Sequence, residues 1–336
     1  MPAGSGDGLE KFEDMIVRAA ESTAAHVLAA KAAIGTVIFG QDKVVEQALV
    51  TILSGGHALL LGVPGLAKTK LVDTMGIVLG LDARRIQFTP DLMPSDILGT
   101  EVLEESATGK RNFRFISGPV FAQLLMADEI NRASPRTQSA LLQAMQEQHV
   151  TVAGVRHDLP KPFHVLATQN PLEQEGTYPL PEAQLDRFLM QIDVGYPDRE
   201  AERKILFETT GADETRAKPA MSAEDLMAAQ RLVRRLPVGE SVVAAILALV
   251  RSARPGPEGG EATKLIAWGP SPRASQALML AVRASALLDG RLAPSIDDVI
   301  DLAEPVLKHR MALTFTARAE GESLEGVIGR LKARIG

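Results

Sequence analysis

The stretch Gly62-Val63-Pro64-Gly65-Leu66-Ala67-Lys68-Thr69 largely determines how this chain is interpreted. It follows the apolar run 58–61 and precedes a helix-like segment at 70–75. A strand, a glycine-containing turn, a Lys-Thr pair and a helix are typical of a phosphate-binding loop, because backbone N–H groups of the turn and helix N-terminus can surround an anion. Lys68 would reach the terminal phosphates, and the Thr69 hydroxyl would hold Mg²⁺. The sequence therefore predicts a nucleotide site at this junction.

One position departs from the general pattern, which has glycine immediately before the lysine. Ala67 stands there instead, and because alanine carries a Cβ we expect the turn to form with a negative φ at this residue. Pro64 fixes one φ angle and removes one donor. The alternative is an ordinary strand-turn-helix junction with a surface lysine, so residues elsewhere in the chain must decide between the two interpretations.

Composition limits the class of protein. With 336 residues, two domains are the default, and 46% hydrophobic residues are enough for a real core. Aromatic residues make up only 4%, so the cores are expected to be aliphatic. The absence of cysteine excludes disulfides, thiolate zinc sites and cysteine nucleophiles. A net charge of −6 argues against a general nucleic-acid coat, although a local basic stripe stays open.

The first residues of the chain and its longest apolar run indicate where in the cell the protein is expected. The polar start at 1–7 lacks the basic-then-apolar order of a signal peptide. The longest strongly apolar run, Val242–Val250, is far too short to span a bilayer. A soluble cytoplasmic protein is therefore the expectation.

The first half of the chain alternates short apolar strands with helices. Helices are predicted at 9–35 and 42–54, and strands at 57–61, 85–88, 123–127, 164–168 and 190–194. This alternation predicts a parallel sheet covered by helices on both faces. Ligands of such sheets bind beyond the carboxyl ends of the strands, so the loop and the polar residues after the third and fourth strands should converge at one edge.

Two excursions interrupt this pattern, at about 90–119 and 149–158. In the first, Thr100–Leu103 and Asn112–Ile116 can pair as a hairpin across the turn 107–109. Exposed hairpins on a compact sheet domain are more often functional than structural, because nothing in the core needs them.

The character changes after residue 197, where only helices are predicted. They span 199–209, 223–236, 240–253, 271–288, 296–313 and 324–335, with a Pro- and Gly-rich loop at 254–270. The expected division is an N-terminal helix at 1–36, an α/β domain at 37–197 and an all-helical domain at 198–336.

Two further strand ends carry chemistry. Asp128 and Glu129 follow the apolar stretch 124–127. Next to a phosphate loop, Asp128 can hold Mg²⁺ through Thr69 or water, and Glu129 can polarise an attacking water as general base. Asn170 ends the next strand, where its amide could bond the γ-phosphate or that water. The alternatives are a solvated acidic turn and a simple Asn-Pro turn.

These segments together resemble the MoxR-type AAA+ ATPases. The resemblance covers the α/β module and the helical domain, and is carried by Gly62–Thr69, Gln87–Gly99, Ala127–Arg132 and Gln169–Phe188. It implies a P-loop fold with a five-stranded parallel sheet and a C-terminal helical lid. Ala before Lys-Thr is common in that family, so Ala67 is no defect there. The excursions correspond to the family's helix-2 insert and presensor hairpin.

The resemblance also implies roles for particular residues. Arg187 matches an arginine finger that reaches the γ-phosphate of a neighbouring subunit; the alternative is a surface arginine paired with Asp186. Arg273 resembles the lid's sensor arginine, placed where the helix dipole disfavours a cation. The segment Gly40-Gln41 resembles the one that lies against adenine. The expected nucleotide-binding residues are Gly40, Gln41, Gly62, Pro64, Gly65, Leu66, Ala67, Lys68, Thr69 and Lys70; Glu129, Asn170, Arg187 and Arg273 are the catalytic set, and Thr69 with Asp128 the metal ligands.

The function expected from this resemblance is Mg-dependent ATP hydrolysis by a ring, a hexamer by analogy, that remodels a partner protein. The implied partners are a von Willebrand factor A-domain protein or a metalloenzyme undergoing maturation. Three alternative functions fit the sequence less well: a nucleic-acid motor, disfavoured by the charge and few aromatics; an ATP-binding scaffold without turnover, which would not need Glu129; and a small-molecule kinase, which would need a phosphoacceptor pocket.

Overall fold

The computed structural model describes residues 6–105, 111–173, 175–211, 215–256 and 262–335. At its centre lies a five-stranded sheet in the order β2-β5-β8-β1-β9. All its neighbours are paired in parallel, which confirms the predicted sheet. The strands are β1 (Ala58–Leu61), β2 (Ala83–Gln87), β5 (Leu124–Asp128), β8 (His164–Gln169) and β9 (Met190–Asp193).

Alternate residues of the central strands enter two separate hydrophobic cores, one on each face of the sheet. Leu60 packs in the core that also contains residues of α2 (Asp42–Leu53) and α3 (Lys68–Val78). Leu59 lies in the other core, together with residues of α5 (Pro135–Glu147). The sheet is thereby covered on both faces, as its nearly continuous apolar strands predict.

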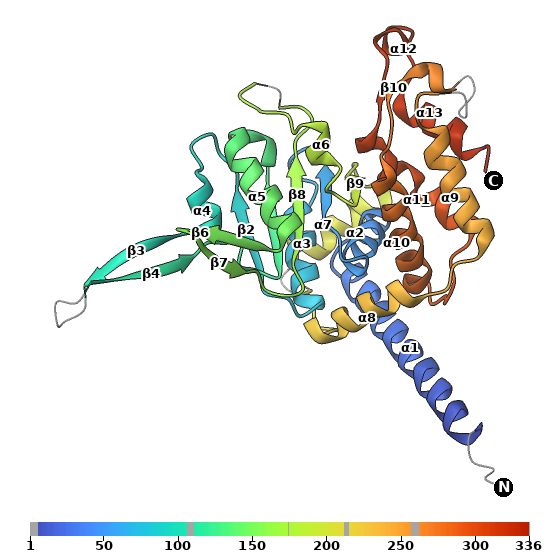
Figure 1. Ribbon diagram of the computed structural model, residues 1–336, viewed down its shortest axis with the longest axis horizontal. Coiled ribbons are helices and arrows are strands. Elements are labelled where there is room, and N and C mark those ends of the chain that lie inside the picture. The colour runs from blue at the N-terminus through green and yellow to red at the C-terminus, as the bar shows by residue number, and fades with distance from the viewer. Residues whose placement is uncertain (1–5, 106–110, 174, 212–214, 257–261, 336) are drawn as a thin grey trace.

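Two hairpins extend from this sheet domain, and Figure 1 shows the longer one projecting well beyond it. Strand β3 (Gly99–Glu105), which follows the short helix α4 (Pro94–Leu98), pairs with β4 (Arg111–Ser117), and β6 (His149–Val152) pairs with β7 (Val155–Asp158). The predicted turn at 107–109 lies outside the described residues. The hairpins meet where the Phe115 ring stacks on His157, with centroids 3.9 Å apart.

The long helix α1 (Gly6–Gly35) leads into the sheet domain, and a short η1 turn (Ile130–Arg132) follows β5. The four-residue helix α6 (Glu182–Leu185) precedes β9. Among the described residues, no helix is both long and apolar enough to cross a membrane.

The chain after residue 197 is mainly helical, and its elements from α9 onward form the right-hand part of Figure 1. Its elements are α7 (Arg199–Thr210), α8 (Ala223–Arg235), α9 (Glu240–Ser252), β10 (Ile266–Trp268), α10 (Pro272–Leu288), α11 (Ile296–Leu307), η3 (Lys308–Arg310), β11 (Ala312–Leu313), α12 (Phe315–Ala319) and α13 (Leu324–Lys332).

The sequence-based expectation of helices alone in this part was wrong at two places. The helix predicted over 296–313 ends at Leu307, and β11 pairs antiparallel with β10 in a small two-stranded sheet. The reason is tertiary. The three residues of η3, Lys308–Arg310, are buried and bind the sheet domain, which draws the chain out of the helix.

Two buried histidines connect β8 and the segment before β1. His164 Nδ1 lies 2.8 Å from Gly56 O, so its other ring nitrogen accepts from Gln230 of α8 at 3.0 Å. His57 Nδ1 accepts the backbone N–H of Val165 at 2.9 Å. Burial lowers the pKa of His57 to about 3 and that of His164 to about 4. Both rings are therefore neutral in the folded protein at pH 7.

We expect acidification to destabilise the fold through these histidines. The unfolded chain takes up a proton on each ring near its ordinary pKa of 6.5, whereas the folded chain does not. The contribution of these histidines to the free energy of unfolding is therefore complete above pH 6.5. It falls by about 1.4 kcal/mol per histidine per pH unit as the pH drops toward 4. Urea denaturation at pH 7, 6 and 5 measures this slope. His164→Gln should reduce it, whereas the exposed control His26→Gln should not; equal slopes would contradict the assignment.

Candidate active site

The phosphate-binding loop joins β1 to α3, and its backbone differs from the expectation at Ala67. Ala67 has φ +56° and Gly65 φ +87°, both in the left-handed region. The predicted negative φ at Ala67 is therefore wrong: alanine adopts the conformation for which glycine is usual, at some cost in strain. Helix α3 begins at the next residue, and alanine has no side-chain oxygen to cap it. The first N–H groups of α3 are thus left for an anion.

Lys68 folds back over its own loop. Its ammonium donates to Gly62 O and, at 3.4 Å, approaches Val63 O. Burial lowers the pKa of Lys68, while the charges of Asp128 and Glu129 act in the opposite direction. The lysine is therefore held close to both acids by contacts that a phosphate group can replace.

The Asp128 carboxylate, at the end of β5, is bonded on both oxygens. Thr168 Oγ1 donates to Oδ1 at 2.6 Å, and Arg85 of β2 donates to Oδ2 from Nη2 at 2.5 Å and Nε at 3.2 Å. The side chain is only 12% exposed. A buried carboxylate beside the hydroxyl-bearing start of α3 suits a hard cation such as Mg²⁺, which prefers oxygen ligands. Arg85 is the positive charge that now balances it.

Glu129 has a left-handed backbone, with φ +55°, and its carboxylate, like that of Asp128, bonds to a residue of β2. Its N–H donates to Thr168 Oγ1 at 2.8 Å. Its carboxylate accepts from Gln87 Nε2 at 2.6 Å and from Arg132 Nη1 at 2.9 Å. To polarise a water, as the sequence predicts, Glu129 would first have to exchange these partners.

Asn170 lies one residue beyond β8 and is buried, with its Oδ1 accepting Leu172 N–H at 3.2 Å. The register places Leu61 of β1 opposite Gln169, and Gly62 N–H donates to Gln169 O at 3.2 Å. The loop, the paired acids and Asn170 therefore share the carboxyl edge of the sheet, as the strand pattern predicts.

Two cavities adjoin the loop. The smaller, about 120 Å³, is lined by Ile38, Gln41, Leu66, Ala67, Lys70, Pro197 and Ile205, among others. Its apolar walls suit a purine base. Gln41 Nε2 donates to Gly195 O at 2.8 Å, and a Cβ on Gly40 would lie 2.3 Å from that of Ala201. The larger cavity has a volume of about 380 Å³. Gly62 and Leu66 of the loop line one side of it, and Lys308 and Leu324 of the helical part line the other.

Arg187 and Arg273 lie elsewhere. Neither lines the two cavities. Arg187 precedes β9 and donates to Leu142 O of α5 at 2.6 Å. Arg273 is 55% exposed, and its Nη1 lies 3.9 Å from the Asp186 carboxylate. Asp186 itself is paired with Arg310, at 2.7 Å, so the alternative of an Arg187–Asp186 pair is not the arrangement found.

The structure adds site residues that sequence reasoning missed. Arg85, Gln87, Arg132 and Thr168 hold the two acids. The sequence does contain a pattern that indicates two of them. Arg85 and Gln87 are two residues apart in a predicted strand, which places their side chains on the same face. Their contact with β5 follows from pairing that sequence alone did not reveal.

A loop of this kind, an acid pair on the next-but-one strand and a helical domain over a parallel sheet define an AAA ATPase. The family model for the ATPase family associated with various cellular activities (AAA) matches residues 57–190, and that for the AAA lid domain matches 261–329. A putative ATPase from Cytophaga hutchinsonii superposes with a TM-score of 0.89 and 37% identity, covering 98% of this chain and 99% of that one.

Similarity to named relatives narrows the family. Chaperone MoxR1 of Mycobacterium tuberculosis is 46% identical over 297 residues, covering 88% of this chain and 78% of that protein. Protein MoxR of Paracoccus denitrificans is 32% identical over 314 residues, covering 88% and 91%. The chain belongs to the MoxR family of AAA ATPases.

We expect Lys68→Ala to weaken nucleotide binding at least about tenfold, because the substitution removes a charge-assisted contact to phosphate. Equilibrium titration with a fluorescent ATP analogue measures the effect. The matched control is Lys218→Ala, which changes an exposed lysine between α7 and α8. Unchanged affinity of the Lys68 variant would refute the assignment of the loop.

Proposed function

We propose that the protein hydrolyses Mg·ATP as a ring of identical subunits, a hexamer in the simplest arrangement. The observation that carries this proposal is the separation of the predicted catalytic groups. The loop, the acids and Asn170 lie at the carboxyl edge of the sheet. Arg187 lies on the amino-terminal side of β9, with Arg273 close to its neighbour Asp186. One subunit then supplies the nucleotide site and the next supplies the arginines.

The roles within the site follow from the side chains present. Asp128 and Thr69 would hold Mg²⁺, which neutralises phosphate charge when bound. Glu129 acts as general base after leaving Gln87 and Arg132, and Asn170 orients the water or the γ-phosphate. Pro64, which is exposed, contributes to the loop through its restricted backbone. Gln41, Lys70 and Leu66 contact the base through the smaller cavity.

We propose that the energy of ATP hydrolysis is used to remodel a partner protein. The proposal also divides the chain into an α/β domain at 37–197 and a helical domain at 198–336. Support comes from a relative named as a chaperone and from the β3–β4 hairpin, where Leu103 pairs with Phe113 across the strands. These side chains are 54% and 72% exposed. By family analogy the partner is a von Willebrand factor A-domain protein or a maturing metalloenzyme, met in the cytoplasm, where ATP is available.

Glu129→Gln should keep ATP binding and lose turnover by about 100-fold or more, because the amide cannot accept a proton from water. Phosphate release under saturating ATP measures turnover, and titration measures binding. Glu173→Gln, in the exposed loop after β8, is the control and should retain activity. Undiminished hydrolysis by the Glu129 variant would remove this residue from its role.

The ring itself can be tested by mixing inactive variants. Arg187→Ala and Lys68→Ala should each be inactive alone. Mixed together they should recover part of the turnover, because the intact loop of one subunit meets the intact arginine of the other. Mixing Arg187→Ala with the double variant lacking both groups is the control and should stay inactive. If fluorescence transfer shows subunit exchange yet no activity returns, an arginine acting between subunits is refuted.

A further inference from the structure

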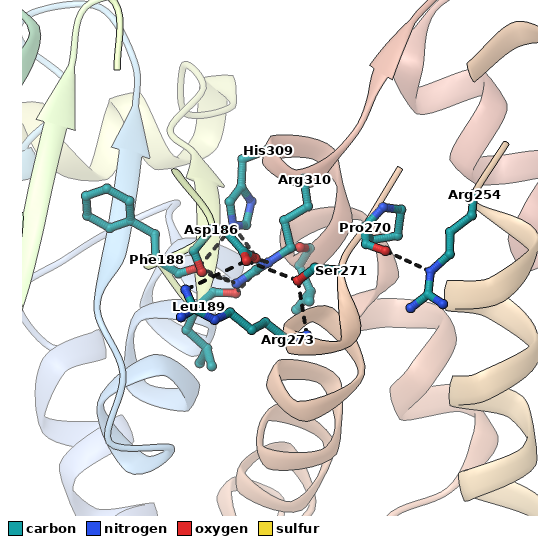
Figure 2. Close-up of polar contacts among 10 residues, drawn as sticks. Asp186, Phe188, Leu189, Arg254, Pro270, Ser271, Arg273, His309 and Arg310 are labelled. Atoms are coloured by element: carbon teal, nitrogen blue, oxygen red, sulfur yellow. Dashed lines mark hydrogen bonds and ion pairs between the residues drawn. The ribbon is translucent and has the colours of Figure 1, made fainter. Parts of the chain in front are cut away.

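Arg310 of η3 is almost fully buried, with 3% of its side chain exposed, and it binds the chain on both sides of Arg187 (Figure 2). Its Nε donates to the Asp186 carboxylate at 2.7 Å. Its Nη2 donates to Asp186 O at 3.3 Å and to Phe188 O at 2.6 Å, and its Nη1 donates to Leu189 O at 3.0 Å. One lid side chain thus holds the backbone immediately before and after Arg187.

The same guanidinium is anchored firmly in the lid. Its Nη1 also donates to Val306 O in the last turn of α11, at 2.5 Å. The neighbouring His309 Nε2 lies 3.0 Å from Phe188 O. A buried guanidinium without partners is costly, so these bonds must stay together or break together. The planar five-donor fork of arginine is what allows so many acceptors to be reached at once.

Asp186 connects this clamp to the second predicted arginine. Its carboxylate accepts Ser271 Oγ at 3.1 Å, and Arg273 lies within 3.9 Å. Ser271 is the N-cap of α10, because its Oγ accepts the N–H of Arg273 at 3.1 Å. The start of α10 is therefore bound to the same carboxylate that receives Arg310.

The Arg187 side chain is held less firmly than its backbone. It makes the bond to Leu142 O, but its buried Nε has no hydrogen-bond partner among the described residues. The guanidinium can therefore change direction toward a ligand, while the position from which it does so is set by the backbone contacts of Arg310.

We propose that Arg310 and Asp186 are positioning residues for Arg187, so that the lid and the segment 186–189 move as one body. This inference rests on the proposed role of Arg187 in a neighbouring subunit's site. Movement of a lid is then transmitted through Arg310 to the arginine that the same subunit presents to its neighbour. The lid of one subunit thereby controls hydrolysis in the next, rather than only in its own site.

The test uses Arg310→Lys, which keeps the charge but lacks the fork. Alone, this variant should bind ATP normally and hydrolyse it at least tenfold more slowly. Mixed with Lys68→Ala, it should regain turnover, since its own site is intact and receives a well-placed Arg187. Mixed with Arg187→Ala, it should stay inactive, since neither subunit then supplies a placed arginine. A variant that is merely unstable would lose both its own nucleotide site and the Arg187 that it presents to its neighbour. The proposal would be overturned if the mixture with Lys68→Ala stayed inactive despite confirmed subunit exchange, or if the mixture with Arg187→Ala became active.

Controls separate this proposal from the assignment of Arg187. Arg291→Lys alters another lid arginine, bound to Asp298 within the lid, and should retain activity. Amide hydrogen exchange does not depend on the role of Arg187 in a neighbouring site: both Arg310→Lys and Asp186→Asn should raise exchange of residues 186–189 at least tenfold, with exchange in the strands of the sheet unchanged. Unchanged amide exchange in that segment would refute the claim that Arg310 and Asp186 hold it in place. This result is independent of the mixture of Arg187→Ala with Lys68→Ala, which tests whether Arg187 acts between subunits.

Discussion

Parallel pairing of the strands places the chemistry of this protein at one edge of its sheet. With Leu61 opposite Gln169 and Gln87 opposite Asp128, the segments that follow or end these strands must meet there. No local feature of the loop could bring it to the acids, which are some 60 residues away along the chain. The site exists because the cores on both faces of the sheet keep this register.

Within that edge, every acidic or basic group of the site has a partner in the chain. Asp128 is balanced by Arg85, Glu129 by Gln87 and Arg132, and Lys68 by the carbonyls of its loop. Buried charges need such partners because an unpaired charge in a low-dielectric site is costly. On the proposed function, binding of Mg·ATP would be an exchange of partners, in which a cation and phosphates would replace side chains that already satisfy the site.

The lid interface follows the same principle of paired buried charge. Lys308 reaches Asp193 at the end of β9, and Arg310 reaches Asp186 before it. Both residues belong to the three-residue η3 turn, so this short segment connects the lid to both ends of one strand. That is why the helix predicted over 296–313 stops at Leu307: the contacts made outside a helix outweigh the local preference to continue it.

The sequence by itself determined the parallel sheet, both hairpins and most lid helices, and it placed the loop 62–69 and the acid pair at strand ends, because these depend on local patterns of apolar residues, glycine and strand-end polar groups. Tertiary structure alone decided the left-handed φ of Ala67, the partners Arg85, Gln87, Arg132 and Thr168, the β10–β11 ladder and the clamp of Arg310. Most of these bring together groups far apart in the chain, whereas the φ of Ala67 and the Arg132–Glu129 pair are local conformations that the pattern did not reveal. Pattern and propensity report what a segment prefers, whereas burial and pairing decide which atoms it finally meets.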